Sequence, residues 1–163
     1  MSEIQKLYEE IKNFRPDQDF KSEWIAKNQL NNGIYYTQKL GFFLCNYREQ
    51  GDKIIPGNNA LTNSQIRNVF GEAKRIQMKV VDNPDKWQEE KINFKLLKPK
   101  LAYAVGRADP KNKIKDLRPV LDKAIDAVED NEVNNNQESV DRLNRFVQFL
   151  EAILAYHKAY GGK

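Results

Sequence analysis

The sequence is 163 residues long, carries a formal net charge of +4 at pH 7 and contains a single cysteine. This length corresponds to about one domain and is sufficient to bury a hydrophobic core without covalent crosslinks. One cysteine excludes an internal disulfide, and because Cys45 lies in an apolar run we expect its thiol to be buried. No apolar run is long enough to span a membrane and the N-terminus lacks the apolar core of a signal peptide, so we expect a cytoplasmic protein with no membrane contact.

The charge is unevenly distributed along the chain. Residues 1–60 are balanced, residues 61–118 contain 14 lysines and arginines against 7 acidic residues, and residues 119–163 contain 5 against 8. A basic middle segment of this kind indicates a polyanionic partner. The same asymmetry would also allow the acidic end of one copy to meet the basic middle of another.

The first part of the chain gives one clear helix and one ambiguous segment. Apolar residues recur at helical spacing in residues 2–14, and Pro16 ends this helix because the residue before a proline avoids the helical region. Residues 18–33 are ambiguous, although a short helix there would turn three apolar side chains toward a core: Phe20, Trp24 and Ile25. We therefore treat residues 1–33 as a less certain N-terminal extension.

Residues 34–50 form the next helix prediction, because apolar and aromatic residues again follow the helical period. Gly51 and Asp52 end this helix. A proline, a glycine and two asparagines follow closely, so residues 51–60 are predicted to be a loop.

Residues 61–80 are predicted to form a helix with a marked N-terminus. Thr62 and Gln65 have the spacing of a capping box, in which each side chain accepts a hydrogen bond from the other residue's backbone N–H. Arg67 and Lys74 are seven positions apart and so project from nearly the same angle beside the apolar stripe. The stripe consists of Ile66, Val69, Phe70, Ala73, Ile76 and Val80.

Three further helical segments complete the chain. Residues 87–107 have core spacing but contain Pro99, which either kinks one helix or follows the end of one helix at Lys98 and opens another. Residues 114–129 are helical, and residues 137–160 form a helix with so wide an apolar arc that it either lies centrally in a bundle or exposes part of itself to a partner. Without sustained strand-like alternation, the fold class is all-α: a compact bundle of about five to six helices, organised as a single domain over residues 1–163.

Candidate catalytic groups are few. A single histidine, His157, and a single cysteine cannot form a structural zinc site, and no nucleophile motif supports a Cys45–His157 dyad between two distant helices. No glycine-rich phosphate loop is present, and the adjacent acids Glu89 and Glu90 point about 100° apart on a helix, as expected of a solvated face. We therefore expect a protein that is not an enzyme, with no catalytic residues, no metal and no cofactor.

The features of a binding protein are stronger. Lys100, Tyr103 and Arg107 share one helical face at positions i, i+3 and i+7. An aromatic ring between two cations suits contact with phosphates combined with stacking of a base or sugar. The alternative is that Tyr103 is an ordinary tyrosine of the core or its boundary.

Two segments carry a resemblance to a known family: Leu-Thr-Asn-Ser-Gln-Ile-Arg at residues 61–67 and Leu-Leu-Lys-Pro-Lys-Leu-Ala-Tyr-Ala-Val-Gly-Arg at residues 96–107. In order and spacing they resemble the small helical subunit of the type III-A CRISPR-Cas (Csm) effector complex, over roughly residues 34–160. The resemblance implies a non-catalytic helical bundle that acts in antiviral defence. It also implies stacked copies along guide RNA (crRNA) and target single-stranded RNA, beside the backbone subunits and the large polymerase-like subunit.

The resemblance and the charge pattern together give the candidate RNA-binding residues, which are Arg67, Lys74, Arg75, Lys98, Lys100, Tyr103 and Arg107. A second hypothesis is a helical protein–protein adaptor whose basic strip binds an acidic partner and no RNA. A DNA-binding regulator is disfavoured, because the segments 62–80 and 87–107 lack the tight glycine-containing turn of a helix-turn-helix.

Overall fold

Helices account for 69% of the chain, and the only sheet is a two-stranded hairpin, so the prediction of an all-α fold is confirmed. The computed structural model describes residues 1–163. Seven helices have at least eight residues, slightly more than expected. The elements are α1 (Glu3–Glu10), α2 (Pro16–Asp19), α3 (Glu23–Ala26), α4 (Ile34–Phe43), β1 (Arg48–Gln50), β2 (Lys53–Ile55), α5 (Asn63–Val80), α6 (Trp87–Lys95), α7 (Leu97–Arg107), α8 (Ile114–Val128) and α9 (Asn136–Ala159).

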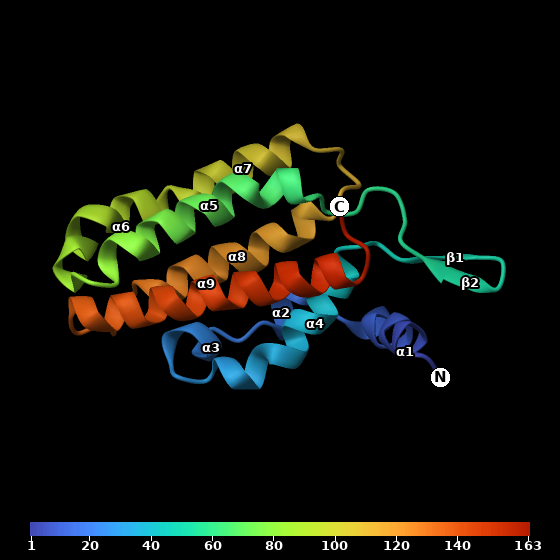
Figure 1. The fold of residues 1–163 in the computed structure, drawn as a ribbon, viewed down its shortest axis with the longest axis horizontal. Coiled ribbons are helices and arrows are strands. Elements are labelled where there is room, and N and C mark those ends of the chain that lie inside the picture. Colours follow the sequence, from blue (N-terminus) through green and yellow to red (C-terminus); the bar gives the residue numbers. More distant parts are fainter.

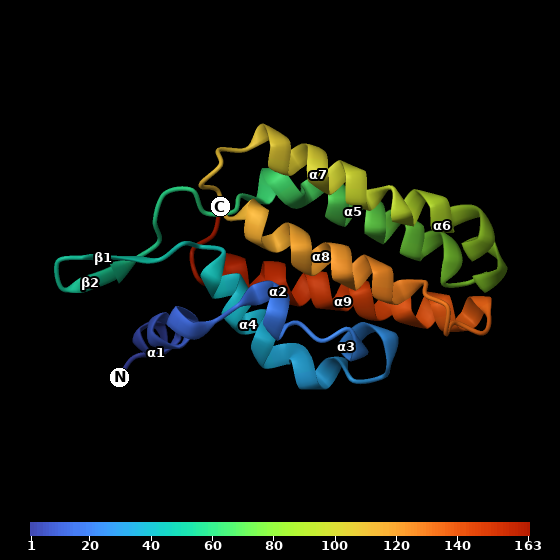
Figure 2. The same ribbon diagram turned by 180° about the vertical axis from the view of Figure 1, so that it is seen from behind.

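The long helices run roughly along one direction and form layers. Helices α5, α6 and α7 lie on one side, α8 and α9 in the middle, and α4 with the short N-terminal helices on the other side (Figure 1). The β1–β2 hairpin projects from one end of the bundle, and the reverse view shows the same arrangement (Figure 2).

Helix α9 lies at the centre of the bundle and packs against α3, α4, α5, α6 and α8. Its wide apolar arc is therefore buried within one chain, which answers the question that the sequence left open. The aromatic ring of Phe146 meets that of Phe94 on α6 edge to face, with 5.2 Å between the centroids. The buried apolar residues of α9 are Val140, Leu143, Phe146, Val147, Phe149, Leu150 and Ile153.

Helix α5 begins as the sequence predicts. The Thr62 hydroxyl oxygen accepts a hydrogen bond from the Gln65 N–H at 3.3 Å, and the Gln65 side-chain oxygen accepts one from the Thr62 N–H at 2.8 Å. These reciprocal bonds satisfy two backbone donors that the first turn of a helix cannot pair internally. The apolar stripe is buried except for Phe70, which is partly buried.

The segment around Pro99 consists of two helices and not one kinked helix. Helix α6 ends at Lys95, α7 begins at Leu97, and Leu96 serves as the cap of both. Pro99 lies in the first turn of α7, where its missing N–H costs no intrahelical hydrogen bond. The helix-start alternative is therefore correct, although the change of helix occurs at Leu96 and not at Lys98.

The predicted helix over residues 34–50 is wrong beyond Phe43. Asn46 adopts φ = +52°, a left-handed conformation that interrupts a helix and that asparagine tolerates better than most residues. The Leu44 carbonyl oxygen then accepts a hydrogen bond from the Leu61 N–H at 2.9 Å, a contact between residues far apart in sequence. The intervening chain forms the β1–β2 hairpin, so part of the predicted loop over residues 51–60 is a strand.

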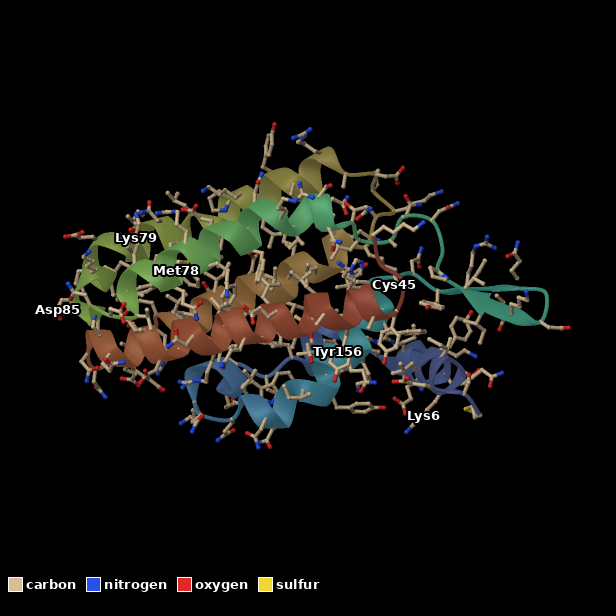
Figure 3. The ribbon with its side chains drawn as sticks, viewed as in Figure 1. Lys6, Cys45, Met78, Lys79, Asp85 and Tyr156 are labelled. Atoms are coloured by element: carbon tan, nitrogen blue, oxygen red, sulfur yellow. The ribbon has the colours of Figure 1, made fainter.

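Cys45 and His157 meet at the end of the α4–α9 contact, although they are far apart in the sequence. Figure 3 shows the position of Cys45. The Cys45 thiol is buried as predicted, and its hydrogen-bond partners are the carbonyl oxygens of Gly41 and His157 at 3.5 and 3.3 Å. The His157 ring is directed elsewhere, with Nε2 2.7 Å from the Leu61 carbonyl oxygen. Burial raises the pKa of Cys45 to about 12, so its thiol stays protonated at neutral pH. Cys45 and His157 are therefore packed in the core and do not form a nucleophilic dyad.

Burial also lowers the pKa of His157 below its ordinary value of 6.5, and the ring Nδ1 is buried without a hydrogen-bond partner. The unfolded chain therefore binds a proton more readily than the folded chain. The contribution of neutral His157 to the free energy of unfolding is fully present above pH 6.5 and is lost as the pH falls below this value. The loss is at most about 1.4 kcal/mol for each unit by which the pKa in the folded chain lies below the pKa in the unfolded chain.

Urea denaturation between pH 7 and pH 5 should show this loss of unfolding free energy in the native sequence. In a His157→Gln variant the pH dependence should be shallower, because the titrating group is gone. Parallel pH profiles for the two proteins would contradict the assignment.

Candidate nucleic-acid interface

Helices α5 and α7 lie side by side (Figure 1). Side chains of the two helices line a groove of about 820 Å³. The groove runs between two faces with the same spacing, i, i+3 and i+7, one from each helix. The side chains that line it are Ser64, Gln65, Asn68, Val69 and Glu72 from α5, and Pro99, Lys100, Tyr103, Ala104, Arg107 and Ala108 from the α7 side.

Three of the predicted RNA-binding residues, Lys100, Tyr103 and Arg107, line this groove together. Tyr103 is 67% exposed, so the alternative of a core or boundary tyrosine is excluded. The Arg107 guanidinium carbon lies 5.5 Å from the centre of the Tyr103 ring, within the range of a cation–π contact. Lys100 and Arg107 form no salt bridge, so both cations are available to an anionic ligand.

Arg67 lies on α5 outside this groove. Its side chain is exposed and forms no salt bridge. Arg67 and Lys74 project from nearly the same angle of α5, as their seven-residue spacing predicts. Because Lys74 pairs with Glu151 on α9, Arg67 lies on the flank of α5 that faces α9, away from the groove.

Two other predicted residues are held by acids from neighbouring helices. Lys74 Nζ lies 2.7 Å from Glu151 Oε1 on α9, and Lys98 Nζ lies 2.8 Å from Asp126 Oδ1 on α8. Both pairs are partly exposed, and surface pairs of this kind contribute only about 0–1 kcal/mol. Lys74 and Lys98 could bind a phosphate only by weakening these salt bridges. They are therefore weaker candidates for RNA binding than the unpaired cations.

The last predicted cation, Arg75, pairs with Glu72 one turn earlier on α5, with 3.0 Å between Nε and Oε2. This hydrogen bond, together with the nearby charge of Lys100, lowers the pKa of Glu72. The carboxylate of Glu72 is therefore ionised at neutral pH and lies in the groove wall.

The α5 side of the groove was missed by the sequence analysis. Gln65, Asn68 and Glu72 have the same i, i+3, i+7 spacing as the three residues of α7. That signal was present in the sequence, but only the packing of α5 on α7 shows that the two faces meet.

Two findings bear on other kinds of site. The structure contains no group of three His, Cys, Asp or Glu side chains that could hold a metal ion. The prediction that Glu90 lies on a solvated face is wrong, since this residue is only 7% exposed. Its carboxylate accepts a hydrogen bond from Asn93 at 2.9 Å and pairs with Lys79 at 3.2 Å, and these contacts offset the cost of burial. Separately, none of the helices combines the length and apolar character needed to cross a membrane.

Comparison with known families gives one match. The model of the family described as Csm2 Type III-A matches residues 44–163, which include both walls of the groove and the helices that support them. No curated protein and no solved structure matches the chain significantly. The match covers more than half of the chain and agrees with the resemblance seen in its two characteristic segments. The chain therefore belongs to the Csm2 family, the small subunits of type III-A CRISPR-Cas (Csm) complexes.

Proposed function

We propose that this small Csm subunit binds RNA phosphates without catalysing a reaction, as part of a type III-A interference ribonucleoprotein in antiviral defence. Copies of the chain would stack along the guide RNA–target RNA path in the cytoplasm, in contact with one another and with the backbone and large polymerase-like subunits. The observation that carries the proposal is the groove in which the unpaired Lys100 and Arg107 flank the exposed ring of Tyr103.

The mechanism is electrostatic. Lysine and arginine side chains that neutralise phosphates release condensed counterions, which makes binding favourable at low salt and independent of sequence. A single subunit offers only a few such contacts, so it binds weakly alone. Stacked copies on one strand act at high effective concentration, and this supplies the remaining affinity.

A fluorescence-polarisation titration with an unrelated labelled single-stranded RNA tests this proposal. The logarithm of the binding constant should fall linearly with the logarithm of the salt concentration, with little dependence on RNA sequence. The labelled RNA should also remain full length after incubation, because a non-catalytic subunit does not cleave it.

The adaptor hypothesis predicts a different result. A chain that binds an acidic protein partner should bind a labelled poly-glutamate peptide and leave RNA unbound even at low salt. That outcome, or cleavage of the RNA, would overturn the proposal.

A further inference from the structure

The two sides of the groove between α5 and α7 carry side chains of opposite charge. Its α7 side carries the two unpaired cations Lys100 and Arg107, and its α5 side carries the ionised carboxylate of Glu72. The Glu72 carboxylate is paired with Arg75, so the α5 side offers no unpaired cation to a phosphate. The cations available to phosphates lie at the α7 rim, which leaves the interior of the groove to an uncharged part of the ligand.

The side chains within the groove suit a flat, uncharged group with polar edges. The Tyr103 ring is 67% exposed and has the Arg107 guanidinium beside it, 5.5 Å from its centre. Gln65 uses its side-chain oxygen in the helix cap, so its NH₂ group is left for a ligand, and the exposed Asn68 offers a second amide. A volume of about 820 Å³ lies within the range of about 300–1,000 Å³ of small-ligand pockets.

We infer that the groove takes one unpaired nucleobase of an RNA strand, which stacks on Tyr103 while Lys100 and Arg107 hold the flanking phosphates. The amides of Gln65 and Asn68 then lie at the edge of the base. This inference rests on the proposed RNA binding and adds to it. Bases in a continuous duplex are covered on both faces by their neighbours, so the groove selects strands with at least one unpaired base.

The test compares two labelled strands of equal length and phosphate number, one with ordinary bases and one that is abasic throughout. Tyr103→Ala should weaken binding of the ordinary strand about tenfold, which is within the range for loss of one base–aromatic stack, and change binding of the abasic strand less than twofold. Tyr103→Phe keeps the ring and should bind both strands as the native protein does. Because Tyr103 is largely exposed, neither change should disturb the fold, which circular dichroism would verify.

The two proposals fail in different ways. If Tyr103→Ala weakened both strands equally, or neither, the base pocket would be refuted while phosphate binding stood. If the native chain bound a blunt RNA duplex as tightly as the single strand of equal length, selection of an unpaired base would also be refuted. If the native chain bound neither strand, both the pocket and the proposed function would be refuted.

Discussion

Replacing Arg67, Lys100 and Arg107 together by alanine is expected to abolish most of the RNA affinity of the isolated subunit. None of the three forms a salt bridge, so each can neutralise a phosphate without first losing one. Each lost phosphate contact should flatten the salt dependence by roughly 0.7 on single strands. Loss of three contacts corresponds to about 100-fold weaker binding at about 0.1 M salt.

A matched control comes from the three predicted cations that are already paired. The variant with Lys74, Arg75 and Lys98 replaced by alanine removes the same charge from the same helices, yet should affect RNA binding much less. If the two triple variants lost affinity and salt dependence equally, pairing would not distinguish binding cations from structural ones.

A second control tests the effect of net charge alone. Lys6, Lys21 and Lys27 are exposed and lie in the N-terminal segments, which Figures 1 and 2 place across the bundle from α5 and α7. Figure 3 shows Lys6 on α1 at this far side. Replacing these three lysines should leave the salt dependence nearly unchanged. A loss as large as that of the groove variant would mean that RNA responds to overall charge and to no particular surface.

Replacing Gly41 by alanine is expected to destabilise the fold. A Cβ atom at this position would lie 2.6 Å from the Tyr156 Cβ and 2.7 Å from the His157 backbone nitrogen, where α4 crosses α9. Both atoms belong to or lie next to the backbone of α9, so the clash can be relieved only if α4 and α9 move apart. Overpacking of this kind costs about 1–3 kcal/mol or more of unfolding free energy, measurable by urea denaturation.

Gly71→Ala is the corresponding control on α5. Nothing lies within 4 Å of an added Cβ at Gly71, which is in the middle of a helix. Alanine there should stabilise the protein by about 0.5–1 kcal/mol, because glycine loses more backbone entropy in a helix. Equal stabilisation by both substitutions would show that α4 and α9 do not approach as closely as described.

Local sequence patterns predict the positions of most helices, because helix formation depends on neighbouring residues. The capping box at Thr62 and Gln65 uses partners three residues apart, and the apolar stripe of α5 follows the helical period. The face shared by Lys100, Tyr103 and Arg107 follows from the same period. Residues 61–67 and 96–107 also carried the family resemblance that the Csm2 match confirms.

Features that depend on partners far away in the chain could not be predicted from such local patterns. Helix α4 ends at Phe43, and the Leu44 carbonyl oxygen instead accepts a hydrogen bond from the Leu61 N–H beyond the hairpin, which no local pattern reveals. Lys74 and Lys98 have the same charge and spacing cues as the free cations, but Glu151 and Asp126 reach them only after α9 and α8 have packed. The groove exists for the same reason: helical period places side chains on a face, whereas only packing determines which two faces meet.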